Sequence, residues 1–378
     1  GGKDYQFTDS KGNIWTVDEN GTVSGPKKPA KGGASTPANT DGVDSSGSAT
    51  AITAQGIKVE FENKTNGSQS ENSKYAFDKP TKALTNDYKE IDGKFIPFKA
   101  VENQKTEPFI AKVTLTDTAV KADSLIFKTS KGVAIDAKKV GDTFELTLKG
   151  TFSYAKEEVQ AVIKQGDKYK VAGVFYLVHI SSKTIKLNLV PTSSTIDLEN
   201  KKQEIKNIYS KVAIDVDISV KPPFDISPYL VDGKLPTADA FGDLSTYSDA
   251  QNSIISDYKS KNNVGLEYYI FVTDKPSSTG QDGYMRLNGQ FGFVFDQSAR
   301  TIAHELGHGA LKLEHPFKQF STITKGSTTG LLDYAIGTDF IYTDWKQIND
   351  PAFKLYSFQG QSSGEMYDRL FKDANGKY

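Results

Sequence analysis

Residues 298–311 read SARTIAHELGHGAL, and this stretch decides the fold around it. Ser298, or Asp296 just before it, can cap a helix whose apolar residues continue to about Leu311. On a helix, the four-residue spacing sets His304 and His308 one turn apart on the same face. Two imidazoles in that arrangement can bind one metal ion, with a carboxylate, Glu305, beside them.

Chance is a poor explanation for this spacing. The chain has four histidines in 378 residues, and multiplying residue frequencies gives such a match a probability of roughly a few in a thousand. A pair of structural histidines on a helix is the alternative. H-E-x-x-H on a helix is the signature of zinc hydrolases, above all metallopeptidases, in which the glutamate deprotonates a metal-bound water.

A third ligand is expected shortly after the helix. His315 is favoured, because neutral imidazole is a standard zinc ligand and a third histidine this close is otherwise hard to explain. Its neighbour Glu314 is the alternative. Gly309 is available for a bend, and Pro316 is expected to end the helical path just after His315.

Composition limits the possible partners and compartments. The net charge is −1, from 46 basic and 47 acidic side chains, which does not indicate a nucleic acid or an anionic membrane as partner. No apolar run approaches the length of a membrane span. Cysteine is absent, which excludes disulfides, thiolate metal sites and a cysteine that blocks the metal. Gly1 and Gly2 suggest a fragment of a longer protein.

The first half of the chain is predicted to be all β. Short strands and turns indicate a β ribbon over residues 1–25, and a Gly, Ser, Thr, Pro and Lys composition predicts a flexible linker over 26–50. Alternating apolar residues over 51–196, up to the strand Ile185–Val190, predict a β-sandwich-like accessory domain. His179, outside the cluster, is expected to be structural.

From residue 197 to 378 the pattern changes to mixed α and β. Helices are predicted over Leu198–Val212 and Ser248–Lys261, with possible caps at Thr195 or Asp197 for the first. Strands are predicted at the segments Ala213–Val220, Tyr268–Val272, Gly283–Arg286 and Gly292–Phe295. The fold class is therefore a multidomain protein with an all-β N-terminal part and an α+β domain.

This order of elements before the motif helix resembles the N-terminal half of the zincin fold, most closely its metzincin branch. The resemblance is coarse over Asp197–Phe317 and specific only around the motif. Thr301–Phe317 and the later Leu331–Tyr334 run also resemble peptidase modules of large secreted bacterial proteins of the polymorphic-toxin kind. The resemblance implies a twisted sheet carrying an active-site helix, and an exported, extracellular bacterial protein.

The chain departs from the metzincin pattern H-E-x-x-H-x-x-G-x-x-H. Leu311 stands at the glycine, Glu314 at the third ligand, and His315 comes one residue late. Leu332 stands where the family has a methionine, in a turn beneath the metal. Tyr334 either corresponds to the family tyrosine that steadies the oxyanion, or is a buried core residue. Two aspartates are further candidate ligands: Asp339 by resemblance to aspzincins, and Asp333 by resemblance to gluzincins.

These features together predict a zinc endopeptidase acting on a protein or peptide substrate. Zinc is held by His304, His308 and His315, Glu305 is the general base, and Tyr334 helps the metal to stabilise the oxyanion. Extended substrate is expected to pair with an exposed edge strand near Tyr284–Leu287. Two alternatives stay open: a toxin or effector whose β domain binds a protein target, and an adhesive module with a vestigial zinc site.

Overall fold

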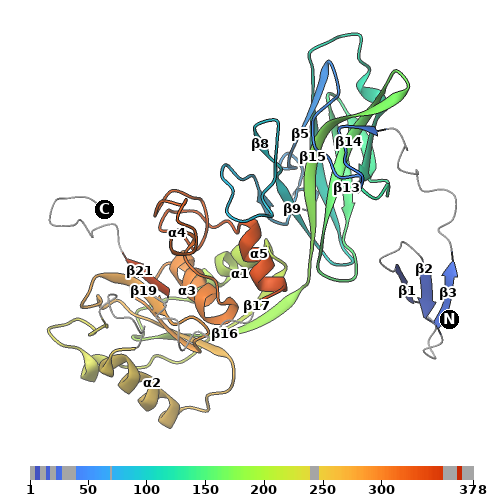
Figure 1. Ribbon diagram of the computed structural model, residues 1–378. Coiled ribbons are helices and arrows are strands. Elements are labelled where there is room, and N and C mark those ends of the chain that lie inside the picture. Colours follow the sequence, from blue (N-terminus) through green and yellow to red (C-terminus); the bar gives the residue numbers. More distant parts are fainter. Residues whose placement is uncertain are drawn as a thin grey trace, which may run out of the picture.

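The computed structural model of the chain describes residues 5–8, 14–17, 23–27, 40–68, 70–238, 247–351 and 364–367. The protein is β-rich and multidomain, with several separate sheets (Figure 1). Within the predicted ribbon, a small antiparallel sheet is formed by β1 (Tyr5–Thr8), β2 (Ile14–Val17) and β3 (Val23–Lys27). Residues 28–39 of the predicted linker lie outside the described residues.

The linker prediction is wrong for residues 40–50, which pack against the β sandwich. β4 (Thr40–Asp41) pairs in parallel with a sandwich strand, and Ala49 is buried. The Ala49 N–H donates to the buried Glu158 carboxylate at 2.8 Å, and the Gly47 carbonyl accepts from the Gln160 amide. Partners more than 100 residues away therefore order a segment that has almost no large apolar side chains.

A β sandwich follows, built from two facing sheets. Alternation in its first strand buries Ile57, Val59 and Phe61, which pack with Phe109 and Phe175 between the sheets. One sheet has the order β12 (Asp136–Val140), β13 (Thr143–Lys149), β10 (Thr106–Leu115), β5 (Ile57–Asn63). The other has the order β11 (Leu125–Thr129), β14 (Ala155–Gln165), β15 (Lys168–Ile180), β9 (Phe98–Glu102), β6 (Phe77–Asp78). A hairpin of β7 (Glu90–Ile91) and β8 (Lys94–Phe95) and a short 3₁₀ turn, Ala122–Ser124, complete this part.

The sandwich ends earlier than predicted. β16 (Lys183–Pro191), expected in the sandwich up to residue 196, is instead a central strand of a second sheet. The sequence pattern of an apolar strand fits either sheet. Parallel pairing with the later strands β17 (Ile214–Val220) and β18 (Tyr268–Val272) places β16 in the second sheet. That sheet has the order β17, β16, β18, β20 (Phe291–Val294), β19 (Gln281–Met285), β21 (Gly364–Tyr367). β19 runs antiparallel to β20 and β21, whereas the other neighbours are parallel.

Helices cover both faces of this sheet (Figure 1). Ile270 and Val272 of β18 share a core with α1 (Lys202–Ser210) and α3 (Ala299–Leu311), while Tyr269 and Phe271 pack with α2 (Asp249–Lys261). The alternating strand positions thus sort the two helix layers. Short 3₁₀ turns lie at Glu199–Lys201 and Ser227–Tyr229. Among the described residues no helix is long and apolar enough to span a membrane.

A last helix, α5 (Tyr342–Asn349), joins the sheet region to the sandwich (Figure 1). The Tyr342 ring stacks on the Phe98 ring of β9, with centroids 4.1 Å apart. The backbone N–H of Tyr342 donates to the Asp78 carboxylate of β6 at 2.9 Å. Asp87 accepts from both Lys156 and Lys346, one from each side of the junction. One continuous apolar core runs through this contact, so the two parts are packed together.

Candidate metal centre

The motif helix has the bounds that its sequence predicts. Ser298 is the N-cap of α3, with its hydroxyl accepting the Thr301 N–H at 2.9 Å, and Asp296 accepts from the Ser298 N–H and the Thr301 hydroxyl. Ile302 and Leu306 are fully buried on the sheet side. The cap and the apolar face therefore fix the position of the helix without a contribution from a metal.

The chain turns back directly after the helix. Lys312 takes the left-handed conformation (φ 58°), and the Leu313 N–H donates to the Gly307 carbonyl at 3.1 Å. The bend expected at Gly309 does not occur there, because Gly309 lies inside α3, where a Cβ would stand 2.1 Å from Cε of Met285 in β19. Pro316 begins a short helix, α4 (Pro316–Gln319), instead of ending one. This turn accommodates the extra residue and returns His315 to the helix.

Three buried imidazoles converge at this point. The Nε2 atoms of His304 and His308 are 2.9 Å apart, and those of His304 and His315 are 3.2 Å apart. All three side chains offer a ring nitrogen within 4.8 Å of the others. The structure thus brings together the three histidines that the sequence predicts to be ligands.

Backbone contacts set the direction in which two of the rings point. The Nδ1–H of His304 donates to the Leu331 carbonyl at 2.8 Å, and that of His308 donates to the Leu313 carbonyl at 2.6 Å. A carbonyl is only an acceptor, so each Nδ1 carries the proton and each Nε2 presents a lone pair. Burial holds the pKa of His304 and His315 well below the usual range and lowers the pKa of His308 to about 4. The rings are therefore neutral, which is the ligand form of histidine.

The geometry fits a small cation with tetrahedral preference. At zinc–nitrogen distances of about 2.0–2.1 Å, two ligands of a tetrahedral site are roughly 3.3 Å apart. The separations of 2.9 and 3.2 Å are close to that value. Lone pairs that face one another at this distance repel, and a shared cation relieves the repulsion. The donor set of three imidazoles suits zinc and also other divalent transition metals.

Glu305 lies buried between the helix and the sheet. Its carboxylate is against Gly283 of β19, where a Cβ would stand 2.5 Å from its Oε1 and 2.9 Å from its Cγ. Gly283 therefore leaves the space that Glu305 occupies, a role that the sequence analysis missed. The signal available was a glycine inside a predicted strand, which often marks a close approach.

A loop after the helix forms another wall of the site. The Tyr334 ring lies 5.0 Å from the His315 ring and 6.4 Å from the His304 ring, centroid to centroid, and Lys325 lies over its face. Leu332 is buried close to Gly307 of the helix. Tyr334 thus lies beside two of the histidine rings, and Leu332 lies against the helix at Gly307.

Arg300 holds this loop to the helix. Its guanidinium donates to the carbonyls of Leu331 (3.1 Å), Asp333 (2.7 Å) and Gly337 (2.8 Å). The Leu331 carbonyl also accepts from His304, so the arginine and the histidine share one acceptor. Arg300 stands one helical turn before His304, and sequence reasoning missed it because its partners are carbonyls of a distant loop.

The alternative third ligands lie outside the imidazole group. Asp333 is buried, and its carboxylate accepts from the N–H groups of Gly326, Thr328 and Tyr334, so it shapes the loop. Asp339 forms an ion pair with Lys211 at 3.0 Å. Glu314, next to His315, is not a member of the group. Among the described residues only the three histidines meet.

The predicted exposed edge strand is not exposed. β19, which contains Tyr284 of the expected Tyr284–Leu287 edge, pairs with β20 on one side and with β21 on the other. The prediction was wrong because β21 is about 80 residues further along the chain and joins the sheet through a non-local pairing.

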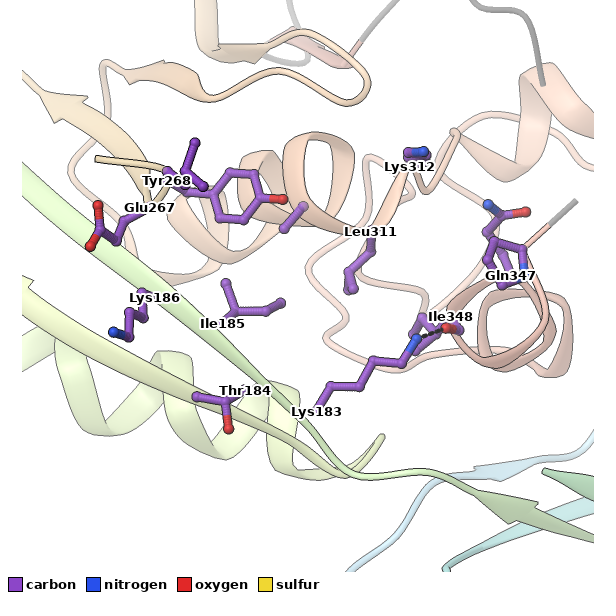
Figure 2. A pocket seen from close by; sticks show the side chains of 13 residues that line it. Lys183, Thr184, Ile185, Lys186, Glu267, Tyr268, Leu311, Lys312, Gln347 and Ile348 are labelled. Atoms are coloured by element: carbon purple, nitrogen blue, oxygen red, sulfur yellow. Dashed lines mark hydrogen bonds between the residues drawn. The ribbon is translucent and has the colours of Figure 1, made fainter. Parts of the chain in front are cut away.

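Two other features lie apart from the centre. His179 is buried in β15, where its Nδ1 accepts the Thr151 N–H and its Nε2 donates to Glu157 at 2.8 Å, which is a structural arrangement. A surface pocket of about 640 Å³ meets α3 only at its last two residues, Ala310 and Leu311, and at Lys312 after them. Figure 2 shows it between β16, β18 and α5, where Lys183 donates to the Ile348 carbonyl. None of the three clustered histidines lines it.

Comparisons with known proteins add little. No protein-family model matches the chain, and no curated protein matches it. Among solved structures, a sialyltransferase from Photobacterium damsela is 14% identical, over 47% of this chain and 35% of its own, with a TM-score of 0.19. A 2,6-sialyltransferase from a Photobacterium species (9% identity, 46% and 41% coverage, TM-score 0.18) and Dex49A from Penicillium minioluteum (8%, 63% and 46%, 0.18) are also similar. The matches span less than half of each of those chains. Likenesses this weak indicate neither the fold nor the function of this protein.

Proposed function

We propose that this protein is a zinc-dependent endopeptidase with a zincin-like, metzincin-type catalytic domain in its C-terminal part. The observation that carries the proposal is the convergence of three buried Nε2 atoms, of His304, His308 and His315, at separations of 2.9 and 3.2 Å. A glutamate follows the first of them on the same helix, at the position of the general base in the H-E-x-x-H signature. The resemblance of Thr301–Phe317 to exported bacterial peptidase modules also supports a secreted location.

Each residue of the site has a proposed chemical role. The three imidazoles would hold zinc, which would supply a Lewis acid and lower the pKa of a water molecule towards ~7. Glu305 accepts a proton from the attacking water and passes it to the leaving amine. Tyr334 lies beside two of the rings and donates a hydrogen bond to the developing oxyanion. Gly283 and Arg300 position Glu305 and the loop that carries Tyr334.

A vestigial site is less well supported. The spacing after His308 was the reason to consider it, and the left-handed turn at Lys312 accommodates that spacing. Three neutral imidazoles that are fully buried and point at one another are costly to retain without a ligand, since buried polar atoms need partners.

The test separates metal binding from turnover. In Glu305→Gln, zinc content should equal that of the parent, whereas cleavage of casein or of a peptide library should fall by about 10²–10⁴-fold, the usual contribution of a general base. Glu314→Gln is the matched control, because it changes a carboxylate in the same segment outside the imidazole group, and it should retain activity. Undiminished cleavage by the Glu305 variant would exclude the proposal.

A further inference from the structure

The chain supplies its own strand to the edge of the sheet beside the metal centre. β21 pairs antiparallel with β19, with Met366 opposite Gly283, Glu365 opposite Tyr284 and Gly364 opposite Met285. Figure 1 shows β21 alongside β19 and next to α3. Without these four residues, β19 would present the outermost row of backbone N–H and C=O groups at that end of the sheet.

This edge lies next to the proposed general base. Gly283 stands at the centre of the pairing, and its Cα faces the Glu305 carboxylate so closely that a Cβ would be 2.5 Å from Oε1. β21 also contacts α3 directly. A backbone that pairs with Gly283 therefore passes beside the helix that carries His304, Glu305 and His308.

We propose that Gly364–Tyr367 is a tethered competitor, which occupies the edge of β19 on which an extended peptide substrate would pair. This inference rests on the proposed peptidase function and names its regulation. Pairing through backbone hydrogen bonds accepts many sequences, so the site takes peptides that can adopt a β strand antiparallel to β19. A folded loop or helix cannot make this pairing.

The weak binding of β21 and its attachment to the same chain together suit a reversible block of the edge. A four-residue strand makes few ladder bonds, each with a net contribution of about 0.5–1.5 kcal/mol, so β21 alone is weakly held. Covalent attachment compensates, because a short tether gives an effective concentration in about the millimolar range. A peptide with a millimolar dissociation constant, attached in this way, lowers the apparent affinity for substrate by a few-fold to about 10-fold.

The test uses the full chain with two prolines, Glu365→Pro combined with Met366→Pro. N–H groups of successive strand residues point to opposite sides, so one of the two prolines removes a donor to β19 whichever residue is paired. The control carries Asp373→Pro and Ala374→Pro, outside the pairing. For a peptide substrate, the apparent KM of the first variant should fall about 3- to 10-fold at unchanged kcat and zinc content. The control should match the parent.

Hydrogen exchange gives an independent result. Amides of Gln281–Met285 that bond to β21 should exchange faster in the Glu365/Met366 variant, and a synthetic peptide of residues 360–371 should restore their protection. Unchanged exchange and unchanged KM would overturn the inference. Faster exchange with no cleavage by any variant would instead overturn the proposed function and show only that the edge binds peptide.

Discussion

Gly283→Ala displaces the carboxylate of the proposed base, Glu305, without replacing that residue. The added Cβ would lie 2.5 Å from Oε1 and 2.9 Å from Cγ of Glu305, and 2.9 Å from Cγ2 of Thr301. Comfortable contacts of this kind are about 3.5 Å, so the carboxylate has to move by roughly 1 Å. None of these three nearest atoms belongs to an imidazole ligand.

The magnitude follows from that displacement. A misplacement of about 1 Å in a catalytic group can lower the rate by ~10²-fold. The extra methyl also costs about 1–3 kcal/mol of stability through overpacking. We therefore expect kcat of Gly283→Ala to fall by about 30- to 100-fold, with the same zinc content as the parent.

The assay measures kcat on a peptide substrate, zinc per chain and the thermal unfolding midpoint. Gly292→Ala is the control: it adds a methyl to the neighbouring strand, 3.1 Å from the flexible Met285 sulfur and away from Glu305. It should cost some stability and little activity. Equal kcat in the two variants would refute the positioning role of Gly283.

Three other variants test separate contacts. Arg300→Ala removes the donors to Leu331, Asp333 and Gly337; zinc affinity, measured by competition with a chelator, should fall about 10- to 100-fold, as for other groups that orient ligands. Tyr334→Phe should keep zinc and lower kcat by about 10- to 10³-fold; an unchanged kcat would remove its oxyanion role. Burial raises the pKa of Asp344 to about 7 and the pKa of its neighbour Asp78 to about 6. The folded state then holds protons that the unfolded state releases above pH ~4, so stability falls as pH rises from about 4 to 7, by at most ~1.4 kcal/mol per unit for each group. Asp344→Asn, which keeps an acceptor for the Ile341 N–H, should flatten this fall in urea unfolding, and a profile as steep as the parent's would contradict it.

Local signals predicted the elements around the site well. The strand Tyr268–Val272, the helix capped by Ser248 and the helix Ala299–Leu311 have the bounds that period and capping residues indicate. The metal group was predictable too, because His304 and His308 share a helix face and His315 follows His308 after only seven residues. Ligands that are near in sequence need little tertiary information.

Two of the wrong predictions share a physical cause, which is long-range pairing. Residues 40–50 are held by groups on β14 and β15, and β19 is covered by β21. Such partners leave no periodic trace in the segments that they order. The left-handed turn at Lys312 was missed for a different reason: it occurs at a residue that is not glycine, and the return of the Leu313 N–H to Gly307 stabilises it.

Zinc affinity is the measurement that tests the metal centre most directly. Purified protein should bind one zinc ion per chain, and His315→Ala should weaken binding by more than ~100-fold, since loss of a ligand exceeds the usual loss of a group that merely orients one. Glu314→Ala and Asp339→Ala should bind like the parent, because neither carboxylate belongs to the imidazole group. A parent chain that binds no stoichiometric zinc, or a His315→Ala variant that binds it as tightly as the parent, would contradict the account.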